Sequence, residues 1–156
     1  HREIGYIGCE PFINGVAKLL SQVEEKALNN IRLHHGDARE VLLRLPDASL
    51  TRVDVLYPDP WPKWRQRKRR FLSVQNIAEI ARVLKPGCVF RFATDIDDYA
   101  GWVLARVLKS PQWMWQEAQT GARPWQQAWD HWPSTRYEAK AFREGRKPAY
   151  FSFIRS

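Results

Sequence analysis

The chain has 156 residues, of which 44% are hydrophobic and 27% charged, so it is long enough for one domain with a substantial core. Its net charge of +8 favours a polyanionic partner. No apolar run reaches membrane-spanning length, so we expect no membrane partner. Cys9 and Cys88 lie in apolar runs, so we expect free thiols and a reducing, cytoplasmic setting.

The first half of the chain alternates strand and helix signals. Apolar residues recur with helical spacing in two segments, which predicts helices over Phe12–Ala27 and Arg39–Leu45. Short apolar or alternating runs predict the strands Tyr6–Cys9, Ile31–His34 and Leu50–Tyr57.

The same alternation continues past residue 70. We predict a helix over Phe71–Leu84, a strand over Cys88–Ala93 and a helix over Tyr99–Leu108, with Asp97 or Asp98 as the N-cap of the last.

The pattern changes near the C-terminus. Trp113–Ala118 is predicted as a strand, Thr120–Pro133 as a connection without a clear period, and Thr135–Arg146 as a loop or short helix. Ala149–Ile154 is predicted as the closing strand.

Alternating strands and helices predict an α/β fold, a doubly wound, mostly parallel Rossmann-like sheet with an antiparallel edge, in a single domain over residues 1–156. Ligands of such sheets bind beyond the carboxyl ends of the strands. Four successive predicted strands are each followed by an acidic residue, which predicts one acidic pocket; the four residues are Glu10, Asp37, Asp59 and Asp95.

S-adenosylmethionine fits such a pocket, because it is a cation that carries hydroxyl and amino donors. Glu10 ends the first strand, where a nucleotide-binding fold places its ribose acid, and Asp37 with Ala38 can meet the adenine edge. The matching glycine-rich turn is then expected roughly 20 residues upstream, before His1. We therefore expect that a first strand and this turn precede the chain.

The segment Tyr57–Arg70 has the most unusual composition in the chain. Three prolines at alternate positions exclude helix interior and central strand, which predicts a stiff, extended loop. The loop holds Asp59 and the indoles of Trp61 and Trp64, and six of the eight residues of Lys63–Arg70 are Lys or Arg. An acid and aromatic faces beside a cationic rim suit a nucleobase on a nucleic acid.

The order of these motifs resembles that of the tRNA (guanine-N7-)-methyltransferase family. The motifs that carry the resemblance are Ile7–Glu10, Gly36–Ala38, Tyr57–Lys63, Lys68–Arg70, Ala93–Asp95 and Thr135–Glu138. The resemblance implies methyl transfer from S-adenosylmethionine to N7 of a guanine in the tRNA variable loop, without a metal. It leaves open whether the protein is a monomer or a homodimer.

The resemblance also implies residue roles, with Asp59 as the catalytic acid. The cofactor-binding residues are Glu10, Asp37, Ala38 and Asp59; the substrate-binding residues are Lys63, Asp95, Thr135, Arg136, Tyr137 and Glu138; the RNA-binding residues are Arg65, Gln66, Arg67, Lys68, Arg69 and Arg70.

Structural roles are an alternative for several of these residues. Asp37 and Asp59 can shape turns, Asp95 can cap a helix, and the basic run can be a solvated face. Thr135 and Glu138 have the spacing of a capping box.

Other functions are also compatible with the sequence. They are methyl transfer to another amine or nucleobase and RNA binding by a non-catalytic subunit. A dinucleotide-dependent oxidoreductase is disfavoured, because the basic segment would be unexplained.

Overall fold

The computed structural model describes residues 2–120 and 124–156, and the chain divides into two compact units. These are the N-terminal unit, His1–Leu45, and the C-terminal unit, Pro46–Ser156. Residue 1 and residues 121–123, which belong to the predicted Thr120–Pro133 connection, lie outside the described residues. Each unit is described by itself.

The N-terminal unit is a parallel pair of strands with two helices. It contains β1 (Tyr6–Cys9), α1 (Ile13–Glu25), β2 (Ile31–His34) and α2 (Ala38–Leu42). Both strands have the predicted bounds. The first helix is followed by Ala27 in the left-handed conformation with φ 48°, a backbone geometry that commonly terminates helices.

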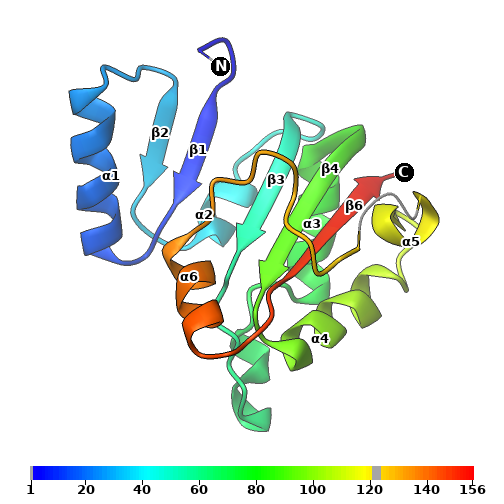
Figure 1. Cartoon of the computed structure of the whole chain (residues 1–156). Helices are drawn as coiled ribbons and strands as arrows, with labels where there is room; N and C mark the ends of the chain where they lie inside the picture. The colour runs from blue at the N-terminus through cyan, green and yellow to red at the C-terminus, as the bar shows by residue number, and fades with distance from the viewer. Residues whose placement is uncertain (1, 121–123) are drawn as a thin grey trace. The chain divides into compact units, whose positions relative to one another are not determined.

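The C-terminal unit is a four-stranded mixed sheet with helices (Figure 1). The sheet order is β3-β4-β6-β5, in which β3 pairs with β4 in parallel and the other pairs are antiparallel. The predicted α/β class with an antiparallel edge is therefore confirmed. The elements are β3 (Leu50–Leu56), the 3₁₀ helix η1 (Trp64–Arg69), α3 (Val74–Val83), β4 (Leu84–Thr94), α4 (Asp97–Val107), β5 (Trp113–Trp115), α5 (Gln116–Thr120), α6 (Arg136–Arg143) and β6 (Ala149–Arg155).

Aromatic side chains of β4 and β6 form the centre of this unit. Phe90 faces Phe153 and Phe92 faces Phe151 across the antiparallel pair, and all four side chains are buried. The rings of Phe92 and Phe151 stack with centroids 6.0 Å apart. Burial of each ring contributes about 1.5–3 kcal/mol, so the strand that leads into Thr94 is firmly held.

The predicted boundaries around β4 and β5 differ from the structure. The turn expected at Lys85–Gly87 lies inside β4, which follows α3 directly; Gly87 has φ 77° and the register with β3 shifts nearby. The strand expected over Trp113–Ala118 ends at Trp115, and α5 begins at the next residue. There the Glu117 carboxylate accepts a hydrogen bond from a β6 amide, which secures the short helix to the sheet.

The segment Thr135–Arg146, predicted as a loop or a short helix, contains the helix α6. Thr135 is the N-cap of α6, and its hydroxyl accepts a hydrogen bond from the Glu138 amide at 3.1 Å. Within residues 2–120 and 124–156, no helix has both the length and the apolar character to cross a membrane.

Candidate functional site

The carboxyl edge of the N-terminal unit carries two of the four predicted acids. Backbone hydrogen bonds connect Glu10 to the end of β2: its amide donates to the His34 carbonyl at 3.1 Å, and its carbonyl accepts from the Gly36 amide at 3.2 Å. Asp37 follows directly. The structure therefore brings Glu10 and Asp37 to the same edge of the β1–β2 pair, as the parallel strands predict.

The two acids at this edge have different local partners. Glu10 Oε1 accepts a hydrogen bond from the Phe12 amide at 2.9 Å. Asp37 is the N-cap of α2, and its carboxylate accepts from the amide of Arg39 at 2.9 Å and from its Nε at 2.7 Å. The Arg39 side-chain hydrogen bond is the main reason that the pKa of Asp37 is lowered, so Asp37 is an anion at neutral pH.

The carboxyl edge of the C-terminal unit carries the other two acids. The Tyr57 amide donates to the Ala93 carbonyl at 2.8 Å, which extends the β3–β4 pairing to the start of the proline-rich segment. Asp59 follows β3 and is exposed, and Asp95 follows β4. The four acids thus form two pairs, each at the carboxyl edge of its own sheet. That these edges form one pocket stays a prediction.

The proline-rich segment is not extended throughout. Tyr57 and Trp61 have left-handed backbone conformations, with φ of 49° and 41°. Such conformations cost non-glycine residues roughly 1–3 kcal/mol and need support from their surroundings. The second half, Trp64–Arg69, forms η1, so the prediction of an extended loop was wrong for these residues. The prolines end at residue 62, and beyond them the backbone can hydrogen-bond within a helix.

Winding into η1 separates the basic residues of this segment. Lys63, Arg65, Lys68 and Arg69 are exposed, whereas Arg70 is 1% exposed. The guanidinium of Arg69 lies 4.9 Å from the centroid of the Trp61 ring. The exposed cations are suitably placed for phosphate contacts.

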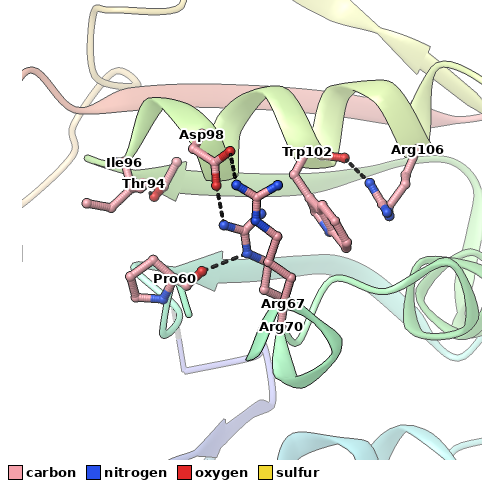
Figure 2. A network of polar contacts seen from close by, with 8 residues as sticks. All are labelled: Pro60, Arg67, Arg70, Thr94, Ile96, Asp98, Trp102 and Arg106. Carbon is pink, nitrogen blue, oxygen red and sulfur yellow. Dashed lines mark hydrogen bonds and ion pairs between the residues drawn. The ribbon is translucent and has the colours of Figure 1, made fainter. Parts of the chain in front are cut away.

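Arg70 points into the C-terminal unit and contacts α4 (Figure 2). Its Nε donates to the Pro60 carbonyl at 2.6 Å, and its Nη2 pairs with the Asp98 carboxylate. The guanidinium also lies 4.8 Å from the ring centroid of Tyr99 and 4.9 Å from that of Trp102. The prediction that Arg70 contacts RNA does not fit this buried position, because its hydrogen-bonding groups face protein.

Asp98 joins a second arginine to the same network. Arg67 Nη2 donates to Asp98 Oδ1 at 2.9 Å. The pKa of Asp98 is lowered, chiefly by the hydrogen bond from Arg70. The residue before α4 is Ile96, which makes no side-chain cap, and Asp97 and Asp98 form the first turn. The prediction that Asp97 or Asp98 is the N-cap was therefore wrong, and Asp98 instead pairs with η1 and the residue after it.

The Thr135–Glu138 tetrad contacts the start of the proline-rich segment. The Tyr137 ring stacks on Tyr57, with centroids 6.1 Å apart and planes at 18°. Glu138 is 5% exposed, and its carboxylate accepts a hydrogen bond from the Trp132 indole. Thr135 and Glu138 therefore have structural partners, while Tyr137 is 46% exposed beside the loop. The guanidinium of Arg136, the preceding residue, lies 5.6 Å from the centroid of the Tyr137 ring.

Tyr57 is partly buried and packs against a buried cluster that includes Tyr150. Burial raises the pKa of Tyr57 to about 12, with smaller increases from the charges of Glu138 and Asp95. Burial is also the largest cause of the raised pKa of Tyr150, and the proximity of Tyr57 and Glu138 adds to it. Both phenols therefore stay protonated at neutral pH.

Asp95 has a partner that sequence reasoning did not identify. Its Oδ2 accepts a hydrogen bond from Arg146 Nε at 2.7 Å, and Arg146 also pairs with Glu144. Sequence reasoning missed three site residues because their partners lie far away in sequence. These residues are Tyr57, Asp98 and Arg146. Within the described part of the chain, no group of three or more His, Cys, Asp or Glu is placed to hold a metal ion.

Comparison with known families gives a match over almost the whole chain. A family model described as "Putative methyltransferase" matches residues 1–150. The match includes both carboxyl edges, the proline-rich segment and the tetrad.

Two curated relatives are each 52% identical to the chain over the aligned residues. A tRNA (guanine-N(7)-)-methyltransferase of Brucella anthropi is 52% identical over 153 residues, covering 98% of the chain and 65% of the relative. A protein of the same name from Mesorhizobium japonicum is 52% identical over 151 residues, covering 97% and 64%. The chain therefore spans slightly less than two thirds of the length of these relatives.

Solved structures resemble the chain in fold. An rRNA methylase from Streptococcus thermophilus superposes with a TM-score of 0.58 at 9% identity, covering 98% of the chain and 87% of that protein. The likeness supports the Rossmann-like fold class.

Proposed function

The chain belongs to the methyltransferase family whose model it matches, and we propose that it forms most of a tRNA (guanine-N7-)-methyltransferase. The observation that carries the proposal is 52% identity to a relative of that name over 153 residues. Because the chain spans 65% of that relative, the activity is proposed for the full-length protein. A tRNA substrate agrees with the predicted cytoplasmic setting.

The residues at the strand ends fit S-adenosylmethionine by their chemistry. Glu10 and Asp37 present carboxylates at one edge, and Ala38 begins the helix that Asp37 caps. Such acceptors match a cation with ribose hydroxyls and an adenine amine. We assign Glu10, Asp37 and Ala38 of the N-terminal unit to the cofactor. When bound, the cofactor supplies a methyl group on a positively charged sulfur.

The chemistry requires positioning more than proton transfer. N7 of guanine already has an in-plane lone pair, so no general base is needed. The site must orient the ring and tolerate the positive charge that moves to the purine. Asp59 is exposed at the end of β3, in the segment that also carries Trp61. Its carboxylate can accept hydrogen bonds from the guanine amino and imino groups and stabilise the cationic product.

The substrate side of the site is proposed at the carboxyl end of β4 and at α6. Asp95 and the exposed Tyr137 are its central groups. We also assign the cations Lys63 and Arg136 to substrate binding. Support comes from the Tyr57–Tyr137 stack, which connects α6 to the segment that contains Asp59. Thr135 and Glu138 act through the α6 N-cap and the Trp132 hydrogen bond.

The RNA backbone is proposed to contact the exposed part of the basic segment. These contacts involve Arg65, Lys68 and Arg69, which are exposed, and Gln66, which is partly exposed. Arg67 and Arg70 are not included among the RNA contacts, because both guanidinium groups pair with the Asp98 carboxylate. Lys and Arg near phosphates release counterions, so binding should weaken steeply with salt.

The replacement Asp59→Asn in the full-length protein tests the proposal. Loss of the charge should lower the rate of N7-methylguanosine formation by about 100-fold or more, while the dissociation constant for tRNA stays near that of the wild type. Asp97→Asn is the matched control, since Asp97 is also an exposed aspartate of the C-terminal unit.

The nucleophile can be tested on the RNA itself. A tRNA in which 7-deazaguanine replaces guanine lacks N7 and should accept no methyl group from the wild-type protein. Methyl transfer to this RNA, or to DNA or peptide in preference to tRNA, would show that another nucleophile is used. Calorimetry with S-adenosylmethionine separates a catalytic protein from a non-catalytic RNA-binding subunit.

A further inference from the structure

We propose that Arg70 and Asp98 are positioning residues: they form a clamp that holds the segment containing Asp59 against α4. The proposal rests on the proposed function, because the carboxylate that it positions is that of Asp59. It concerns residues of one compact unit, whose contacts are defined (Figure 2).

The need for a clamp follows from the prolines around Asp59. Pro58, Pro60 and Pro62 have no backbone N–H groups, so this stretch has few donors with which to attach itself to the protein. Its carbonyl groups remain available as acceptors. The Pro60 carbonyl, next to Asp59, accepts the hydrogen bond from Arg70 Nε at 2.6 Å.

The other side of Arg70 is attached to α4. Its side chain is fully buried, its Nη2 pairs with Asp98, and the rings of Tyr99 and Trp102 lie within 5 Å of the guanidinium carbon. A guanidinium is planar, with donors in fixed directions, so it can contact a carbonyl, a carboxylate and aromatic faces together. An ammonium group concentrates its charge on one atom and cannot make this set of contacts.

The clamp connects the segments that follow two neighbouring parallel strands. The Pro60 carbonyl belongs to the segment after β3, and α4 follows β4 after the short turn that contains Asp95. In that turn the Ile96 amide donates to the Thr94 hydroxyl at 3.2 Å, which fixes the start of α4. Arg70 therefore restrains the position of Asp59 relative to Asp95.

Arg67 strengthens the Asp98 end of the clamp. Its Nη2 lies 2.9 Å from Asp98 Oδ1, so Asp98 receives one arginine at each oxygen. Arg67 lies in η1, and Arg70 directly follows this helix. The 3₁₀ helix and its C-terminal flanking residue thus supply one cation each to a single carboxylate on α4.

The test compares Arg70→Lys with Arg69→Lys in the full-length protein. Both changes keep the charge, but only the first removes the clamp. For Arg70→Lys we expect kcat to fall about 10- to 100-fold, as for small misplacements of a reacting group. The dissociation constant for tRNA and its salt dependence should remain those of the wild type. Arg69→Lys is the charge-matched control for the digestion described next. The control for kcat is Asp97→Asn, an exposed residue outside the proposed site, which should keep kcat.

Limited trypsin digestion, read by mass spectrometry, measures the clamp independently of methyl transfer. Arg70→Lys should increase the rate of cleavage after Lys63 and Arg65, because the released segment is accessible to the protease more often. Arg69→Lys should leave this rate unchanged. If the wild type does not methylate tRNA, the proposed function fails, and this digestion still decides whether Arg70 holds the segment.

Asp98→Asn provides a second variant, with Asp97→Asn as its control, in case Arg70→Lys does not fold. Asp98→Asn should lower kcat and accelerate cleavage in the same way. Unchanged kcat and cleavage in folded Arg70→Lys or Asp98→Asn overturn the proposal. A reduced salt slope for folded Arg70→Gln, which loses the charge, would instead identify Arg70 as a phosphate contact and also overturn the proposal.

Discussion

Arg69 and Arg70 are adjacent and chemically identical, yet they lie in opposite environments. Arg69 is exposed and lies beside the Trp61 ring, whereas Arg70 is buried and contacts Pro60 and α4. The difference arises because Asp98 and two aromatic rings are available on α4 to receive a guanidinium. A run of basic residues can therefore combine exposed cations with a buried one that contacts the loop beside it.

The largest expected difference between the two arginines is in stability. Arg70→Ala removes a buried side chain together with its hydrogen bond, ion pair and ring contacts, and should lower the free energy of unfolding by about 2–4 kcal/mol. Arg69→Ala should change it by no more than about 0.5 kcal/mol. Urea denaturation of the full-length variants measures both. Equal effects would mean that the buried contacts of Arg70 contribute little.

The opposite order is expected for RNA binding. Arg69→Ala should reduce the slope of log K against log salt for tRNA by about 1, the contribution of one phosphate contact. Arg70→Gln should leave the slope unchanged, because the Arg70 guanidinium pairs with Asp98 inside the protein. Replacing both residues together would mix a lost RNA contact with a displaced loop, so single replacements are more informative. If Arg69→Ala keeps the wild-type slope, the RNA backbone lies elsewhere.

The smallest expected effect concerns the acid end of the stability profile. The pKa of Asp98 is lowered in the folded protein, so its ion pairs stabilise the fold above the unfolded pKa near 3.9 and lose this effect as pH falls through the folded value. Because the Asp98 side chain is 48% exposed, we expect less than about 1 kcal/mol. Wild type and Asp98→Asn should differ in unfolding free energy at pH 7 and converge as the pH falls below about 3.9 and through the lowered folded pKa of Asp98. A difference that stays constant throughout this fall in pH would have another origin.

Several site predictions depended only on local sequence and agree with the structure. The ends of β1 and β2 coincide with the predicted strands, because short apolar runs between polar turns define strands locally. Glu10 and Asp37 consequently share an edge. The Thr-x-x-Glu spacing at Thr135 correctly indicated a helix N-cap as one alternative.

Other assignments failed because their partners are distant in sequence. Aspartate is a common N-cap residue, but the Asp98 carboxylate accepts a hydrogen bond from Arg70, 28 positions away. Arg146 pairs with Asp95 across 51 positions, and no local pattern marks that contact. Residues Trp64–Arg69 were expected to be extended with the prolines, although the proline constraint ends at residue 62.

The sequence alone determined the order of strands and helices, the acid after each of four strands, and the position of the proline-rich segment. These features follow from residue spacing, backbone restriction and charge, which act over a few residues. Only the tertiary structure decided which cations face solvent and which contact Pro60 and α4. That choice depends on where α4 places Asp98, Tyr99 and Trp102, because a buried guanidinium is stable only where a carboxylate, a carbonyl and aromatic faces converge around it.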